Sequence, residues 1–126
     1  MKIISTEQAP AAIGPYSQAI IHDGLLFCSG QIPLIPDTGL MIDGGIKNQT
    51  EQVIKNIEAL LTAAGSDFTK VIKTTCFLTD MEDFTAFNEV YAKYFTGKPS
   101  RSCVAVAALP RNALVEIEVI AKINFP

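Results

Sequence analysis

The dipeptide Asp23-Gly24 separates two runs of β-prone residues, 17–22 and 25–30. Asp-Gly between such runs is the strongest short-range signal for a β-hairpin, because the tight turn that matches the twist of paired strands needs positive φ at both central positions. The sequence therefore predicts an antiparallel strand pair here. His22, the only histidine, lies beside the turn, so we interpret it as a solvated surface group rather than a catalytic base.

Two helices are predicted further along the chain. Apolar residues recur at helical spacing over residues 46–64, and Gly65 follows where a helix C-cap belongs. A β-branched run at 71–78 predicts a strand, after which Asp80 and Asp83 can cap a second helix. The second helix carries a stripe of mostly aromatic residues, which we interpret as core: Phe84, Phe87, Val90, Tyr91, Tyr94 and Phe95.

Two more strands are predicted toward the C-terminus. Residues 102–109 are apolar on both faces, so we expect this strand to be covered on both sides, by helices or by a partner subunit. Residues 115–123 alternate, with Glu116, Glu118 and Lys122 on the polar face. The order of hairpin, helix, strand, helix and two strands predicts an α+β fold in which a mixed β-sheet has two helices packed on one face.

No predicted helix remains to cover the other face of that sheet. Hydrophobic residues make up 48% of the chain, charged residues 18%, and the mean hydropathy is +0.28, which is a high apolar content for a small monomer. Identical subunits that pack sheet to sheet would cover the face, so we expect an oligomer. The proline- and glycine-rich residues 31–45 are predicted to form a loop, and loops on rigid hairpins commonly carry binding groups.

Composition limits the classes of protein that fit. The length of 126 residues and the mass of 13.6 kDa fit a single domain, residues 1–126. The net charge of −3 comes without the basic stripe that a phosphate backbone requires, so we expect no nucleic-acid partner. No window approaches the roughly 18 apolar residues of a membrane span, and the first apolar run is too short for a signal peptide. We therefore expect no membrane partner and a cytoplasmic location.

The three cysteines are widely spaced and form no Cys-x-x-Cys pair. This usage is typical of reduced thiols in a cytosol and argues against a structural zinc site. We interpret Cys28 and Cys76 as small buried hydrophobes. For Cys103 the choice between a buried hydrophobe and a site residue stays open, because it lies two residues from Arg101.

The candidate chemistry centres on an arginine and a glutamate. An arginine can grip a carboxylate with two parallel hydrogen bonds and stays charged at any working pH. Of the two arginines, Arg111 follows Pro110 in a predicted turn, which makes Arg101 the better candidate for a fixed clamp. If the strands that carry Arg101 and Glu116 were neighbours, the two groups could line one pocket; the alternative is an ion pair on a sheet surface. No phosphate-binding glycine pattern is present.

Several short blocks of sequence resemble one known family. The block at 99–104, followed by Leu109 and 115–117, is similar to the signature of the RidA family, also called the YjgF family. Further matches span essentially the whole chain: residues 14–19, 29–33, 64–65, 71 and 73–75, 83–84, Asn88 and Tyr91. The resemblance implies a chorismate-mutase-like fold, a homotrimer with ligand clefts between subunits, and hydrolysis of reactive imines or enamines of 2-oxo acids to the 2-oxo acid and ammonia.

The resemblance also implies roles for individual residues. Arg101 would clamp the substrate carboxylate, and Glu116 would hold or activate a water molecule. The backbone amides of Gly30 and Cys103 would donate to the ligand, and the cleft would be completed by Tyr16 and Ser29. An imine carbon is already electrophilic, so orientation and one base are enough, and we expect no metal and no cofactor.

Three other functions are alternatives. A non-catalytic module that binds small carboxylates or partner proteins would use the same cleft. A ribonuclease or translation inhibitor is disfavoured by the net negative charge and the lack of a histidine pair. A chorismate mutase would be expected to bring a second arginine to its dicarboxylate, and Arg111 is poorly placed for that role.

Overall fold

The computed structural model describes residues 1–124 and has one mixed sheet with two helices. Its main elements, in chain order, are β1 (Lys2–Ile4), β2 (Ala19–His22), β3 (Leu25–Cys28), α1 (Ile46–Ala63), β4 (Val71–Leu78), α2 (Phe84–Tyr94), β5 (Ser100–Ala105) and β6 (Val115–Lys122). The strand order is β1-β2-β3-β6-β4-β5, and only β4 and β5 are parallel. The predicted α+β class is confirmed.

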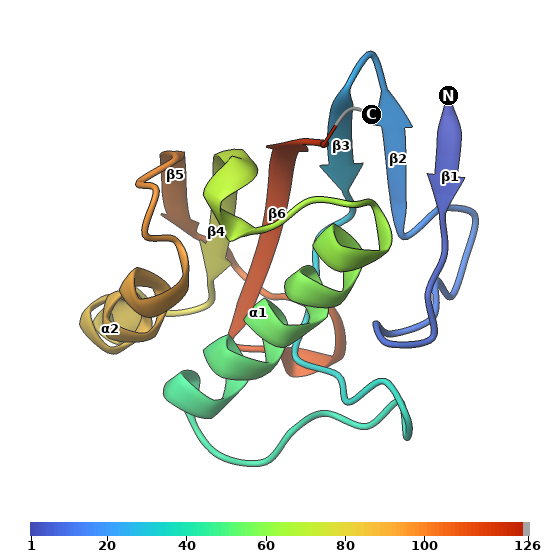
Figure 1. Cartoon of the computed structure of the whole chain (residues 1–126). Coiled ribbons are helices and arrows are strands. Elements are labelled where there is room, and N and C mark those ends of the chain that lie inside the picture. The colour runs from blue at the N-terminus through green and yellow to red at the C-terminus, as the bar shows by residue number, and fades with distance from the viewer. Residues whose placement is uncertain (125–126) are drawn as a thin grey trace.

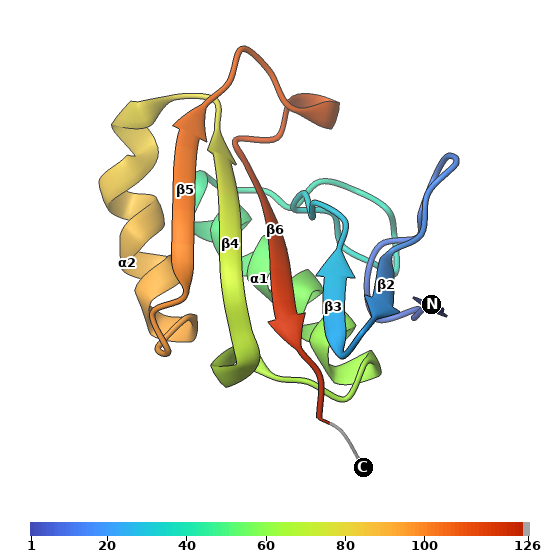
Figure 2. The ribbon, with the colours of Figure 1, turned by 90° about the horizontal axis from the view of Figure 1, so that it is seen from above.

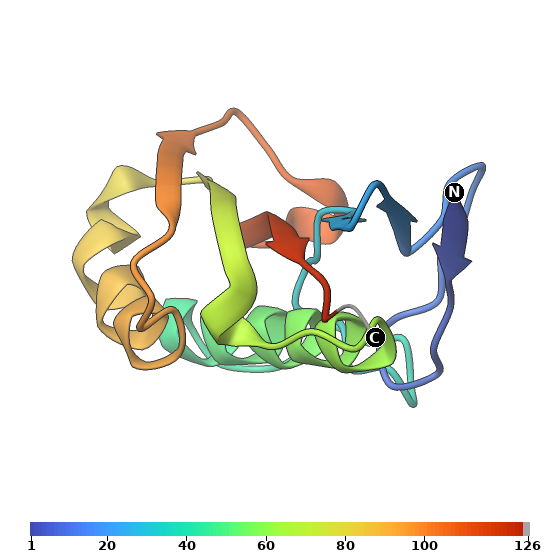
Figure 3. The same ribbon diagram turned by 45° about the horizontal axis from the view of Figure 1, so that its top comes forward.

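Both helices lie on the same side of the sheet (Figures 1 and 3). The apolar face of α1 is buried against the sheet, with Val53, Ile57 and Leu60 fully inaccessible. The aromatic stripe of α2 extends this core through Phe87 and Phe95. Figure 2 shows the opposite face of the sheet, which no helix covers.

The predicted hairpin and the end of the first helix are confirmed in detail. Asp23 and Gly24 have φ values of 51° and 77°, as the tight hairpin turn requires, and His22 is exposed beside them. At the end of α1, Gly65 has a φ of 73°. The amide of Ser66 donates to the carbonyl of Leu61 at 2.8 Å, which completes a Schellman-type ending.

The start of the second helix differs from the prediction. The Asp80 carboxylate accepts from the amide of Glu82 at 2.9 Å and so caps a single 3₁₀ turn, Met81–Asp83, that precedes α2. Asp83 occupies the N-cap position of α2 but makes no side-chain capping bond there. Its φ and ψ of −81° and −4° are helical, because the chain arrives from the preceding turn rather than from an extended segment.

The strand predicted at 102–109 is shifted and is not covered on both sides within the chain. β5 is the edge strand of the sheet, and its residues are exposed or half-buried. The parallel ladder with β4 ends at the pair Leu78 and Ala105. Beyond that pair the chain has no strand beside it, so the apolar residues that follow leave the sheet.

The short strand β1 was not predicted. It pairs with β2 at the opposite edge of the sheet from β5. Its three residues are too few to show a pattern, and only Ile4 of the three is buried.

Candidate functional site

Arg101 projects from β5 toward α2. Its register partner on β4 is Thr74, which is fully buried beneath the helices, so both side chains lie on the helix-covered side of the sheet. The Arg101 guanidinium donates to the Asn88 side-chain oxygen at 2.7 Å. It also lies over the rings of Tyr91 and Phe84, at 4.8 and 5.6 Å from their centroids.

A groove of about 560 Å³ runs beside this guanidinium. Asn88 and two residues of the aromatic stripe, Tyr91 and Phe95, form one wall. Lys98, Pro99 and Arg101 are among the other lining residues. Among residues 1–124, no acidic side chain lines the groove, so its electrostatic character suits an anion.

Glu116 lies on the other face of the sheet. It pairs in register with Phe77 of β4, three residues beyond Thr74, and side chains three apart in a strand point to opposite faces. The strand β4 also separates β5 from β6. The condition under which Arg101 and Glu116 of one chain could line one pocket is therefore not met, because their strands are not neighbours and their side chains point to opposite faces.

The carboxylate of Glu116 packs directly against the α-carbon of Gly30. A Cβ atom at position 30 would stand 2.9 Å from the Glu116 carboxyl carbon and closer still to one of its oxygens. The backbones are joined next to this contact, where the Gln31 amide donates to the Ile117 carbonyl at 2.8 Å. Burial, and then the charge of Glu118 on the same face, raises the pKa of the Glu116 carboxyl.

Tyr16 and Gly30 line a common pocket of about 270 Å³. Its apolar wall includes Ile13, Ile32 and Leu34. The loop that carries this wall is fastened to α1, because the buried Asn56 amide donates to the carbonyls of Ile32 and Leu34 at 3.2 and 3.0 Å. Arg111 completes the lining from a turn where its φ is 58°. The turn position predicted from the sequence made Arg111 the poorer candidate, and only the tertiary structure brings it to this pocket.

Ser29 and Cys103 take different sides of the molecule. The Ser29 hydroxyl donates to the Ser17 carbonyl at 2.7 Å, so its proton is engaged in a bond that joins the segment after β3 to the segment before β2. Cys103 lies on β5 in register with Cys76, on the same face as Arg101. Burial raises the pKa of the Cys103 thiol, although the charge of Arg101 opposes the shift. A thiol that stays protonated at neutral pH is a poor nucleophile.

The other two cysteines are buried, as predicted. Burial raises the pKa of each thiol, Cys28 and Cys76, to about 12. Within residues 1–124, no cluster of three or more His, Cys, Asp or Glu side chains could hold a metal ion. In the same part of the chain, no helix has the length and apolar character needed to cross a membrane.

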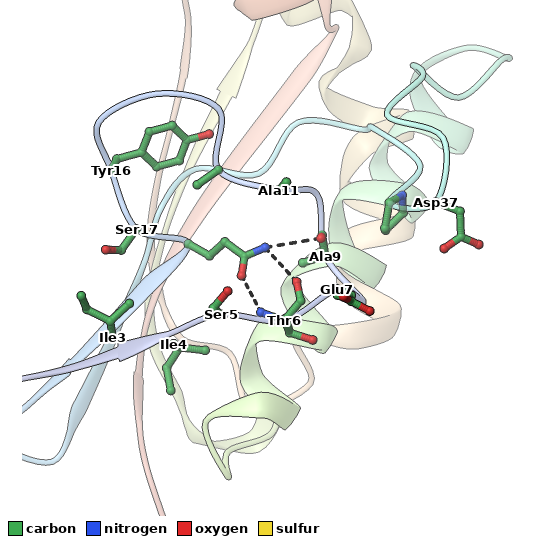
Figure 4. Close-up of a pocket in the computed structure, with 13 residues that line it drawn as sticks. Ile3, Ile4, Ser5, Thr6, Glu7, Ala9, Ala11, Tyr16, Ser17 and Asp37 are labelled. Atoms are coloured by element: carbon green, nitrogen blue, oxygen red, sulfur yellow. Dashed lines mark hydrogen bonds between the residues drawn. The ribbon is translucent and has the colours of Figure 1, made fainter.

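A larger pocket of about 630 Å³ lies beside the N-terminal segment (Figure 4). The buried Gln18 side chain forms part of it. This side chain accepts from the Thr6 amide at 2.7 Å and donates to the carbonyls of Thr6 and Pro10 at 3.0 and 2.8 Å. Neither Arg101 nor Glu116 lines this pocket, and the bonds of Gln18 serve to hold the segment in place.

The site residues therefore fall into two groups on one chain. Arg101 and Cys103 lie on the edge strand β5, on the side of the sheet that carries the helices, whereas Tyr16, Gly30 and Glu116 gather around the β3 end and the open face. Asn88, which touches the candidate clamp, was missed as a site residue. Two signals pointed to it: its match to the family resemblance and its helical spacing from Phe84 and Tyr91.

Comparison with known proteins places the chain in a family. A family model described as Endoribonuclease L-PSP matches residues 6–123. The chain belongs to the RidA (YjgF) family. The resemblance seen in the sequence is thereby confirmed.

Relatives of this RidA-family chain carry different names. A Lactococcus lactis protein described as a regulator, AldR, is 59% identical over 98% of this chain and 99% of its own length. The mouse protein named 2-iminobutanoate/2-iminopropanoate deaminase is 51% identical over 95% of this chain and 90% of its own. Among solved structures, E. coli TdcF with bound serine superimposes with a TM-score of 0.93 at 42% identity, covering 98% of this chain and 100% of that one.

Proposed function

We propose that this chain hydrolyses small 2-imino acids, and the enamines that equilibrate with them, to 2-oxo acids and ammonia. The site would form between two copies of the chain, with Arg101 from one copy and Glu116 from the other. We propose that single-domain subunits do this in the cytoplasm without a metal or cofactor. The deaminase name of the mouse relative and the serine bound to TdcF support this choice of substrate class.

One observation carries the two-chain site. Arg101 and Glu116 lie on opposite faces of one sheet, with β4 between their strands, so a single chain cannot present both to one small molecule. The uncovered sheet face supplies a reason for copies to associate, since Phe27 and Val104 are 42% and 46% exposed there. The homotrimer and the chorismate-mutase-like arrangement implied by the resemblance would bring the β5 edge of one copy to the open face of the next.

The proposed chemistry needs few groups. Arg101 holds the substrate carboxylate, while Glu116 of the neighbouring copy accepts a proton from a water molecule as its oxygen bonds to the imine carbon. Glu116 then returns the proton to the nitrogen, which gives a carbinolamine. It next moves the proton of the new hydroxyl group to the same nitrogen, so that the carbon–oxygen double bond forms as the carbon–nitrogen bond breaks, and ammonia leaves the 2-oxo acid. A carboxyl with a raised pKa is suited to give back the proton it has taken. The apolar wall at Ile13 and Ile32 fits a short aliphatic substrate side chain.

The first test measures release of ammonia and 2-oxo acid while a dehydratase or an amino-acid oxidase generates the imine. We expect the chain to accelerate this release, and Arg101→Ala to lower kcat/KM at least about 100-fold, or roughly 2.7 kcal/mol. Lys93→Ala is the matched control, because it removes an exposed cation of α2 that forms a surface ion pair with Glu51. Undiminished activity in Arg101→Ala would remove the clamp from the proposal.

A non-catalytic binding module is the second candidate. The serine held by TdcF and the regulator description of AldR favour it. It predicts saturable binding of a small carboxylate without turnover of any imine. We do not propose RNA cleavage, although the family model is described as an endoribonuclease. A chain with a net charge of −3 and no basic stripe in its sequence is poorly suited to bind RNA.

A further inference from the structure

The Arg101 guanidinium is held from one side by uncharged groups of α2. Phe84, Asn88 and Tyr91 fall at helical spacing on one stripe of that helix. The Asn88 oxygen accepts from Arg101 at 2.7 Å, and the Tyr91 ring lies 4.8 Å below the guanidinium carbon. These contacts fix the direction in which the remaining N–H groups point.

The α2 residues that hold Arg101 are anchored in the core through Tyr91. The Tyr91 hydroxyl and the Thr74 hydroxyl lie 2.7 Å apart in a buried hydrogen bond. Thr74 is the register partner of Arg101 on the neighbouring strand. The helix, the two strands and the guanidinium are therefore linked in a closed ring of contacts, and the aromatic floor under Arg101 cannot shift without breaking a buried bond.

No carboxylate of residues 1–124 pairs with Arg101 within 4.0 Å. Glu89, the residue after Asn88, is turned to Lys47, which it meets at 2.7 Å. A guanidinium has five N–H donors, and this one has a single hydrogen-bond acceptor among the described residues. Its positive charge is left uncompensated beside a groove without acids.

Whether Arg101 can bind a ligand carboxylate depends on whether residue 88 carries an amide or a carboxylate. The neutral Asn88 amide oxygen accepts one hydrogen bond from Arg101 and leaves the guanidinium charge intact. An aspartate has nearly the same shape but would form a charge-assisted, bidentate pair with the arginine. That pair would neutralise the clamp and occupy the N–H groups that an incoming carboxylate needs.

We propose that Asn88 is a positioning residue for Arg101, and that its lack of charge is the property on which ligand binding depends. Asn88 orients the guanidinium and leaves it free to take a carboxylate from the ligand. The inference rests on the proposed function for its role in turnover, but its binding role requires only that Arg101 receives an anion.

The test compares Asn88→Ala with Asn88→Asp. We expect Asn88→Ala to lower kcat/KM about 10-fold, mainly through KM, because the clamp loses its orientation. Asn88→Asp should lower it about 100-fold, so that the isosteric variant is worse than the truncated one. If Asn88 served only as a hydrogen-bond acceptor for structure, the aspartate variant would match or exceed the alanine variant, and that order would overturn the inference.

Asn48→Asp is the matched control, since it adds the same charge to an exposed asparagine of α1. Half-buried Asn88 lies within a helix, where alanine is the better helix former, so we expect both Asn88 variants to fold. Thermal unfolding checks this. A Tm far below that of the wild-type chain in either variant, together with its loss of binding, would assign Asn88 to structure and overturn the inference.

Binding of propanoate, a carboxylate that cannot react, separates this inference from the proposed function. If wild type binds propanoate but turns over no imine, the deaminase proposal fails, and the order wild type, Asn88→Ala, Asn88→Asp in affinity still supports the role of Asn88. If wild type turns over imines and the two variants bind propanoate as tightly as wild type, only the inference about Asn88 fails. Absence of both binding and turnover in wild type would overturn both.

Discussion

Position 30 requires glycine because a carboxylate occupies the space of a side chain, not because the backbone conformation is unusual. Its φ lies outside the left-handed region, so the backbone would accept alanine. The space where a Cβ would stand is filled by the carboxylate of Glu116. The position and the raised pKa of that carboxyl therefore depend on a missing side chain in another element.

We expect Gly30→Ala to fold normally and to lose at least about 10-fold in kcat, or roughly 1.4 kcal/mol. The added methyl group would displace the carboxylate, which is the end of a flexible side chain and can move at little cost to stability. Steady-state kinetics and thermal unfolding measure the two effects. Gly45→Ala is the control, because a Cβ there would meet nothing within 4 Å. Normal kcat in Gly30→Ala would show that the exact position of the Glu116 carboxylate is unimportant.

At the scale of elements, turns and helix ends could be predicted from local sequence, whereas the pairing of strands could not. The Asp23-Gly24 hairpin and the ending of α1 follow from backbone preferences of a few adjacent residues, which a sequence displays directly. β5 was misplaced because its length is set by the end of the β4 ladder at Leu78, not by its own apolar run. The sequence also does not show which strands are neighbours. It therefore indicated Arg101 and Glu116 as site residues without showing that β4 lies between their strands.

The segment that follows β1 is fastened to the rest of the chain by the Gln18 side chain. Gln18, buried at the start of β2, bonds to the backbone at both Thr6 and Pro10. We expect Gln18→Leu to lower the free energy of unfolding by about 1–3 kcal/mol, because partly buried backbone groups lose their partners. Denaturant unfolding measures the loss, and limited proteolysis should then cut first within residues 5–12. Gln8→Leu, an exposed glutamine of the same segment, should change neither measurement.

On the scale of the whole molecule, the sheet divides the proposed site between its two faces. Arg101 belongs to the face that the helices cover and Glu116 to the face that they leave open. The order of strands places β1 and β5 at opposite edges, so the edge that carries Arg101 is free to approach another copy. The apolar side chains of the open face would be covered by the same association.

This division predicts complementation between two inactive variants. Arg101→Ala and Glu116→Ala should each be inactive alone, but chains mixed by co-expression should recover about a quarter of wild-type activity, since half of the arginines and half of the glutamates are intact and one half times one half is a quarter. The measurement is the rate per site of purified mixed oligomers. Separately purified variants, mixed without subunit exchange, are the control. No recovery in truly mixed oligomers would place both residues of a working site on one chain.

The placement of the two groups on opposite faces also bears on when a newly made chain becomes useful. On the proposed site, a folded chain by itself carries two incomplete halves, and neither half works until another copy arrives. At low expression the activity per chain would therefore rise with concentration, and it would level off once the chains exceed the dissociation constant of the assembly. The amount of protein in a cell would thus set both the number of sites and the fraction of chains that are assembled into complete sites.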